Sequence, residues 1–398
     1  MLDRFDPRLD PAFAAVDQAA LAKRLAAILP PDCLIVSPEA MRPYETDGLA
    51  AYKSLPAAVV LPADADQVCA VLKVCAEFGA PAVARGAGTG LSGGALPFPG
   101  GVLMGLGKMS RILALDPEAR TARVQPGVRN LAISEAAAPF GLFYAPDPSS
   151  QLACSIGGNV AENAGGVHCL KYGLTVHNIL KLEMVTMAGE RLTIGGEALD
   201  APGYDLMALM TGSEGLLGVI TEVTVKLLPQ PAAVAALLAG FADVADAARA
   251  VADIIAAGIT PAGLEMMDAL ALRAAETFAK AGYPREAEAI LICECDGAAD
   301  DAREDLERVA AICQAAGASL VRIAADVAER QRLWAGRKGA FPAMGRLAAD
   351  YYCIDGTIPR RRLPEVLTRI AELSREHGLP VANVFHAGDG NLHPLMLY

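Results

Sequence analysis

The chain has 398 residues, a formal net charge of −12 and a hydrophobic fraction of 53%. This length allows two or three domains with a sizeable core. Because no basic run is present to neutralise phosphates, the acidic balance excludes nucleic acid as a partner.

No apolar run reaches the roughly 18 residues that a membrane span needs. The acidic, proline-bearing start over 1–7 does not have the pattern of a signal segment. We therefore expect a cytoplasmic protein whose membrane contact is peripheral and made through partners. The nine cysteines predict reduced thiols. Cys293 and Cys295 alternate along a strand, which favours core packing and leaves metal binding as the rarer alternative.

The first part of the chain mixes strands and helices. We expect helices over 11–29, 62–79 and 130–140, and strands over 55–61, 102–104, 112–115, 122–125, 179–187, 191–194 and 219–228. Pro229 and Pro231 then break the chain, so we place a domain boundary there. The predicted domains are a helical lead-in over 1–52, a second domain over 53–229 and a third over 230–398.

In the third domain, strands and helices are expected to alternate regularly. Strands over 234–241, 263–267 and 289–295 alternate with helices over 244–257, 268–281 and 299–316. This alternation predicts an α+β domain, with an antiparallel sheet covered by helices on one side.

A glycine-rich loop over 83–95 is the most informative segment. An apolar run ends there in closely spaced glycines, whose backbone amides can form a concave nest for a pyrophosphate. Gly86 and Gly88 have the spacing that begins a dinucleotide-binding turn, but Leu91 replaces its third glycine, so the loop is not of the Rossmann type. Taken alone, a tight structural loop remains the alternative.

Two further loops of small residues, over 146–166 and 212–221, also lie close to predicted strands. One loop would need no partner. Three such loops offer enough backbone for close approach to wrap a single long, flat ligand such as a dinucleotide.

The order of these three loops resembles the FAD-binding domain of the vanillyl-alcohol-oxidase type of flavoprotein. From about Leu21 to the last residue, the chain is similar to the flavin subunits of bacterial glycolate oxidases and to D-lactate dehydrogenases. The resemblance implies an α+β fold, in which a two-subdomain FAD-binding domain of this type, also called the PCMH type, is joined to a ferredoxin-like cap. It also implies that Ala87 stands where some relatives carry a flavin-linked histidine, so the FAD is expected to be non-covalent.

The resemblance assigns the cofactor-binding residues. They are Arg85, Gly86, Ala87, Gly88, Thr89, Gly90 and Leu91 in the first loop, Pro146, Asp147, Ser155, Gly157, Gly158, Asn159, Ala164 and Gly165 in the second, and Glu214, Gly218 and Ile220 in the third.

Two segments of the third domain carry candidate catalytic residues. Arg337 follows the only tryptophan, and a solvated helix face is the simpler interpretation. The resemblance instead implies that Arg337 grips a substrate carboxylate, for which its planar fork is suited. His386 and His393 flank a turn rich in glycine and acid, so both imidazoles can converge on one point. The resemblance implies that they hold a zinc- or manganese-type ion that polarises the substrate hydroxyl.

The remaining histidines have other expected places. His168 is expected to face the flavin, His177 to support packing and His377 to lie on a solvated helix. The segment over 350–359 is expected to form a strand beside the same pocket.

These residues predict FAD-dependent oxidation of a small 2-hydroxy acid, glycolate or D-lactate, to the 2-oxo acid. Electrons would pass to a dye-type acceptor or to partners, namely the iron–sulfur and second flavin-type subunits of a glycolate oxidase complex. Family members continue beyond this chain into a segment that supplies a metal-binding glutamate and a base. The alternatives are therefore a weakly active or non-catalytic flavin-binding subunit, and an aryl-alcohol or sugar oxidase of the same fold.

Overall fold

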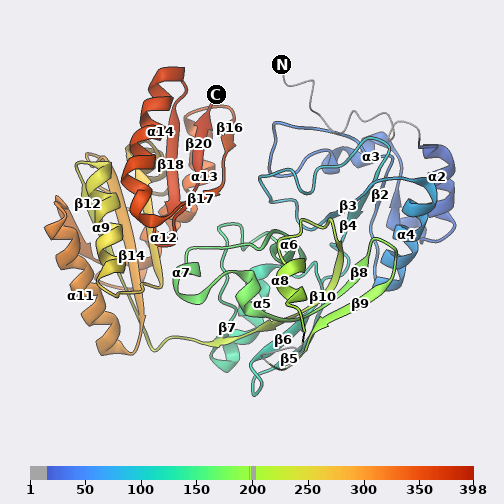
Figure 1. The fold of residues 1–398 in the computed structure, drawn as a ribbon, viewed down its shortest axis with the longest axis horizontal. Coiled ribbons are helices and arrows are strands. Elements are labelled where there is room, and N and C mark those ends of the chain that lie inside the picture. Colours follow the sequence, from blue (N-terminus) through green and yellow to red (C-terminus); the bar gives the residue numbers. More distant parts are fainter. Residues whose placement is uncertain (1–15, 197, 199–202) are drawn as a thin grey trace. The chain divides into compact units, whose positions relative to one another are not determined.

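The computed structural model describes residues 16–196, 198 and 203–398. Within it the chain forms two compact units, shown in Figure 1. The first contains Met1–Gly165 and Leu174–Pro229, and the second contains Gly166–Gly173 and Gln230–Tyr398. Part of the helix predicted over 11–29 lies outside the described residues.

The first unit contains a small sheet and a larger one. The small sheet has the order β1 (Leu34–Ile35), β2 (Ala58–Val60), β4 (Val102–Gly105) and β3 (Ala82–Arg85), with parallel pairing of β4 to both β2 and β3. Helices α2 (Gln18–Ala26) and α4 (Ala65–Phe78) share a hydrophobic core with this sheet. Helix α4 begins where the Asp64 side chain accepts a hydrogen bond from Gln67 N and ends at Gly79 in the left-handed conformation.

The larger sheet of the first unit is antiparallel. Its order is β5 (Ile112–Asp116), β6 (Thr121–Val124), β10 (Gly218–Lys226), β8 (Ile179–Thr186) and β9 (Arg191–Gly195). A separate core joins this sheet to α5 (Asn130–Ala137), α6 (Ile156–Glu162) and α8 (Leu206–Met210). The short strands β7 (Leu142–Phe143) and β11 (Leu228–Pro229) pair with each other.

The second unit is built on one antiparallel sheet. Its main path is β15 (Leu320–Ile323), β12 (Ala233–Phe241), β14 (Ala289–Gly297), β13 (Gly263–Asp268), β18 (Val381–His386), β19 (Asn391–Leu392) and β17 (Gly356–Thr357). Strand β20 (Pro394–Leu397) pairs with β18 and with β16 (Tyr351–Cys353). The segment over 350–359 thus contains two short strands.

Helices cover both faces of this sheet, so the prediction of helices on one side is wrong. One core contains β12 residues Leu237 and Phe241 with α9 (Val244–Ala256), α11 (Ala299–Ala315) and α14 (Leu363–His377). The other contains Leu238 with α10 (Ala269–Ala279), α12 (Val327–Lys338) and α13 (Ala340–Ala343). Successive side chains of a strand point to opposite faces, and here both faces are buried.

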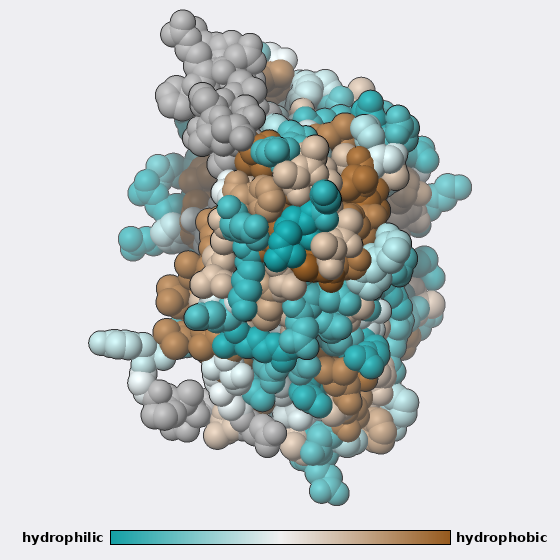
Figure 2. Space-filling model, turned by 90° about the vertical axis from the view of Figure 1, so that its right-hand side faces the viewer, coloured by the Kyte–Doolittle hydropathy of each residue, from teal (hydrophilic) through white to brown (hydrophobic). Residues whose placement is uncertain are grey.

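The surface of the described residues is mixed in polarity. Figure 2 shows separate apolar patches between hydrophilic residues on the face that it draws. In the described part of the chain, no helix has both the length and the apolar character that crossing a membrane requires.

Candidate active site

The three glycine-rich loops meet in one pocket of the first unit. The residues lining it that the sequence singled out are Arg85, Gly86, Ala87, Gly88, Thr89, Gly90, Ser155, Gly157, Gly158, Asn159, Ala164, Glu214, Gly218 and Ile220. Leu91, Pro146, Asp147 and Gly165 are not among the lining residues. Pro146 is linked to a residue that does line the pocket. Asn130 Nδ2 donates hydrogen bonds of 3.0 Å to both Pro146 O and Asn159 Oδ1, and Asn159 is a lining residue.

The first loop lies directly against the second. A Cβ atom on Gly86 would collide with Ser155 Oγ, and one on Gly94 would lie 2.8 Å from Glu162 Oε1. The Arg85 guanidinium lies beside Gly88 of its own loop, and its Nη1 donates to Ala95 O at 3.4 Å and to Thr46 O at 2.7 Å. Its guanidinium therefore supports the backbone of the loop.

The third loop is held by the backbone of helix α6. Gly212 N donates to Val160 O and Glu214 N donates to Ala161 O, both at 2.9 Å. Glu214 has a φ of 55°, a left-handed conformation unusual for a residue with a side chain. The close approach of all three loops fixes a wall made mainly of backbone.

Glu162 gives the pocket an unexpected charge. Its side chain lines the pocket and is exposed to solvent, and partial desolvation of the carboxyl group, together with the negative charges of Glu214 and Asp47, raises its pKa. Glu162 was not among the predicted site residues, although an acid directly before Asn163 and the following glycines was a visible signal.

Arg337, Glu265 and His386 form a buried cluster in the second unit. Arg337 Nη2 lies 2.6 Å from Glu265 Oε2, and both side chains are only 1% exposed. The other oxygen of Glu265 lies 2.7 Å from His386 Nδ1. Glu265 thus contacts both predicted site residues, and the solvated-face interpretation of Arg337 is wrong. An acid within the apolar strand β13 was the sequence signal for Glu265.

His393 lies beside His386. Their ring centroids are 5.1 Å apart, and the rings are nearly perpendicular. The turn between them is closed by Gly390, whose φ is 81° and whose amide donates to His386 O at 3.1 Å. On the outer side, Asp355 Oδ2 lies 3.5 Å from His393 Nδ1. The two imidazoles converge because this tight turn reverses the chain.

The pKa values of the two imidazoles are shifted in opposite directions. Burial opposes a charge on His386, but the negative charge of Glu265 and the hydrogen bond to it outweigh burial and raise its pKa. Burial lowers the pKa of His393 to about 3, with help from the positive charges of His386 and Arg337. His393 is therefore neutral near pH 7 and keeps a nitrogen lone pair.

The other histidines have separate roles. His168 belongs to the second unit, where its Nε2 lies 3.0 Å from Glu294 Oε1. His177 Nδ1 accepts a hydrogen bond from Leu174 N, and His377 is the last residue of α14. Tyr351 packs edge-on against Phe341.

Comparisons with known proteins give the family. One family model, described as an FAD binding domain, matches residues 56–195, and another, described as the C-terminal domain of FAD linked oxidases, matches residues 230–398. The glycolate oxidase subunit GlcD of Escherichia coli is 61% identical over 394 residues, which cover 99% of this chain and 79% of that protein. The chain belongs to the FAD-linked oxidases.

Two further relatives have lower sequence identity. GlcD of Bacillus subtilis is 41% identical, covering 88% of this chain and 75% of its own. A D-lactate dehydrogenase of Anaerostipes hadrus is 35% identical, covering 91% and 78%. Among solved structures, p-cresol methylhydroxylase with substrate bound has a TM-score of 0.79 at 18% identity, covering 97% of this chain and 84% of that chain. The last comparison shows the fold alone.

The pocket of the first unit fits FAD. Its wall is largely glycine and backbone, and a Cβ on Gly86 would fill the space beside Ser155. Ser155 Oγ is buried and has no hydrogen-bond partner among the described residues, so it is available to a bound group.

The fit to a metal ion is incomplete. A catalytic zinc site usually takes three protein ligands. Within the described ranges, no group of three or more histidine, cysteine or acidic residues could hold an ion. His386 and His393 therefore supply two imidazoles, which is one protein ligand short of such a site.

Proposed function

We propose that this FAD-linked oxidase oxidises a small 2-hydroxy acid, glycolate or D-lactate, to the corresponding 2-oxo acid. The observation that supports this proposal most directly is that three glycine-rich loops line one pocket. The chain that forms it is 61% identical to a glycolate oxidase subunit. FAD, when bound, accepts the hydride that leaves the α-carbon of the substrate.

The first unit would bind FAD through backbone. In this proposal, the residues of the first loop hold the pyrophosphate, and the loop around Ser155 and Gly157 follows the flavin side. The binding is non-covalent, because Ala87 offers no atom for a bond to the ring.

The second unit would bind the hydroxy acid. Arg337 Nε and Nη1 are buried and lack hydrogen-bond partners among the described residues. A substrate carboxylate would accept from one of these donors and from the second N–H of Nη2, because Nε and Nη1 lie on opposite edges of the guanidinium, and this bidentate pair would fix its orientation. Neutral His393 offers a lone pair near His386, either to the hydroxyl proton or as one ligand of a divalent ion.

Electrons would leave through partner subunits. GlcD is by name a subunit of a glycolate oxidase, so we propose that this chain works in a complex with an iron–sulfur subunit and a second flavin-type subunit, on the cytoplasmic side of the membrane. Co-purification with an iron-containing protein from the source cells would support this assembly, and a chain that reduces the native acceptor unaided would contradict it.

The test is a dye-coupled screen of short D- and L-hydroxy acids on FAD-loaded protein. We expect dye reduction with glycolate and D-lactate, and less with L-lactate. The matched control is the same preparation stripped of FAD. Equal rates with and without FAD, or activity confined to aryl alcohols or sugars, would contradict the proposal.

A further inference from the structure

The chain leaves the first unit for one short segment, Gly166–Gly173. It belongs to the second unit, whereas the residues before and after it belong to the first. Its chain begins two residues after Ala164, which lines the FAD pocket, and it contains the short helix α7 (Cys169–Tyr172). Whatever holds this segment therefore also holds the end of the second glycine-rich loop through covalent continuity.

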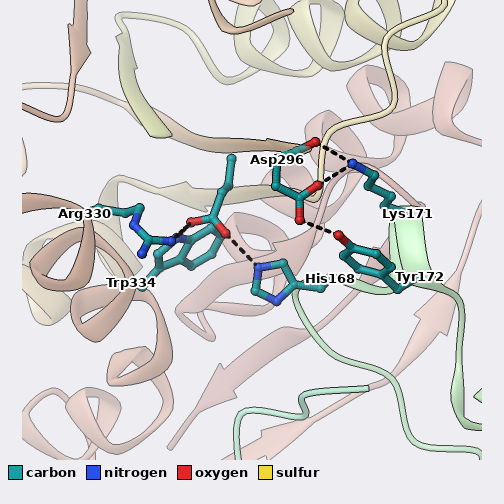
Figure 3. A network of polar contacts seen from close by, with 7 residues as sticks. His168, Lys171, Tyr172, Asp296, Arg330 and Trp334 are labelled. Carbon is teal, nitrogen blue, oxygen red and sulfur yellow. Dashed lines mark hydrogen bonds and ion pairs between the residues drawn. The ribbon is translucent and has the colours of Figure 1, made fainter. Parts of the chain in front are cut away.

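Two acidic residues of β14 hold the segment. Along this strand Leu291 and Cys293 belong to one core and Ile290 and Ile292 to the other. By the same alternation Glu294 and Asp296 point to the face of Ile292. Figure 3 shows that the Asp296 carboxylate accepts hydrogen bonds from the Lys171 ammonium and the Tyr172 hydroxyl.

Glu294 joins the segment to helix α12. It is 4% exposed, and its Oε1 lies 3.0 Å from His168 Nε2. Its Oε2 accepts from Trp334 Nε1 at 2.5 Å and from Arg330 Nη1 at 3.4 Å. A buried carboxylate needs such partners, and here they come from two different parts of the chain.

Helix α12 also carries Arg337, one turn after Trp334. Trp334 is buried, with its ring centroid 5.8 Å from that of His168. The hydrogen bond from the Trp334 indole to Glu294 therefore fixes the rotation and axial position of α12, the helix that carries Arg337.

We propose that Glu294 and His168 are positioning residues of the FAD-linked reaction. Glu294 fixes the arginine-bearing helix through Trp334 and Arg330, and together with His168 it fixes the segment that continues the flavin loop. This inference rests on the proposed function. Releasing the segment gives the loop more conformations to lose when FAD binds, and releasing the helix loosens the substrate clamp.

The experiment compares three variants of the full chain. Glu294→Ala removes the Glu294 contacts to both the segment and α12, whereas His168→Ala removes only the Glu294 contact to the segment; the bonds of Asp296 to Lys171 and Tyr172 remain in both variants. Asp243→Ala is the control, because the Asp243 side chain caps α9 on the opposite face of the sheet. For each variant we would measure the thermal midpoint, the Kd for FAD by titration of the apoprotein, and the KM for glycolate at saturating FAD.

The proposal predicts a split between the two positions. Glu294→Ala should raise both the FAD Kd and the glycolate KM, on the order of tenfold, as supporting residues of active sites typically do. His168→Ala should raise the FAD Kd severalfold and leave KM near the wild-type value, since Trp334 and Arg330 still bind Glu294. Asp243→Ala should lower the thermal midpoint and leave both constants unchanged.

The contrary results are equally specific. If Glu294→Ala loses stability as the control does but keeps both constants, its role is structural and the proposal is overturned. If Glu294→Ala does not fold, His168→Ala decides, because its partly exposed imidazole can be removed with the core intact; an unchanged FAD Kd overturns the proposal. A wild-type chain that binds no FAD refutes the proposed function itself, and this inference with it.

Discussion

Glu265 organises the candidate substrate site at the scale of single residues. Its two oxygens contact Arg337 Nη2 and His386 Nδ1, and the Glu265 and Arg337 side chains are each only 1% exposed. Removing one member of a buried ion pair leaves an uncompensated charge, which typically costs about 3–5 kcal/mol. The arrangement therefore holds a fixed guanidinium with unused donors beside an imidazole pair.

Arg337→Lys should damage turnover far more than flavin content. An ammonium preserves the charge beside Glu265 but cannot make a bidentate pair, so transition-state binding should weaken by about 2–4 kcal/mol. The check is kcat/KM for glycolate alongside the FAD-to-protein ratio. Arg332→Lys, at an exposed position of the same helix, is the matched control. An unchanged kcat/KM would rule Arg337 out as the carboxylate clamp.

Glu162→Gln should stabilise the FAD-free protein near pH 7. The folded state raises the pKa of this carboxyl, so folding favours its protonated form, and its ionisation costs stability once the pH rises above the ordinary value of 4.5. The stability gain should therefore shrink as the pH falls toward 4.5. Thermal midpoints across this range would show it. Exposed Glu118 is the control position, and a gain that does not depend on pH would contradict the electrostatic cause.

At the scale of elements, the two glycines of helix α6, Gly157 and Gly158, are packed to different degrees. A Cβ on Gly157 would lie 2.6 Å from Pro126 Cβ and 3.1 Å from Pro126 O, whereas one on Gly158 would meet only Ser155 Oγ at 3.5 Å. Gly157 is required by the packing of the helix against the chain at Pro126. Gly158 leaves open space on the pocket side.

Gly157→Ala should therefore destabilise the FAD-free protein by about 1–3 kcal/mol, the usual cost of overpacking. Gly158→Ala should be neutral or stabilising by up to about 1 kcal/mol, because alanine favours a helix over glycine. Denaturant unfolding of both variants without FAD gives the comparison. Equal free energies of unfolding would contradict the close packing of Gly157 against Pro126.

The sequence predicts elements well where their pattern is local. Helix α4 has an acid at its start and Gly79 at its end, and β12 to α11 alternate at regular spacing. The helix predicted over 268–281 is α10, but the prediction did not place it on the second face of the sheet, although the uniformly apolar run of β14 indicates that both faces are buried.

Pairings between distant residues are harder to foresee. The glycine loops were recognisable by composition, and the two histidines by their turn. The partners of Arg337 and Trp334 are Glu265 and Glu294, which lie in the mostly apolar strands β13 and β14. Which carboxylate meets which donor depends on strand register, and no short-range pattern specifies that.

At the scale of the whole molecule, FAD should be held only by non-covalent contacts. The three loops form one pocket, and the first loop has alanine at position 87. Acid precipitation should release the yellow chromophore into the supernatant, where its absorbance is measured. A yellow pellet after washing would contradict this prediction.

Anaerobic mixing of the FAD-loaded chain with glycolate or D-lactate, with the flavin absorbance followed in time, tests the proposed reaction without any added acceptor. We expect bleaching of the bound flavin and formation of the 2-oxo acid in equal amount, with much slower bleaching in Arg337→Lys. A flavin that stays oxidised with both acids, in protein that is fully loaded and folded, would contradict the assignment of this chain as a 2-hydroxy-acid oxidising enzyme.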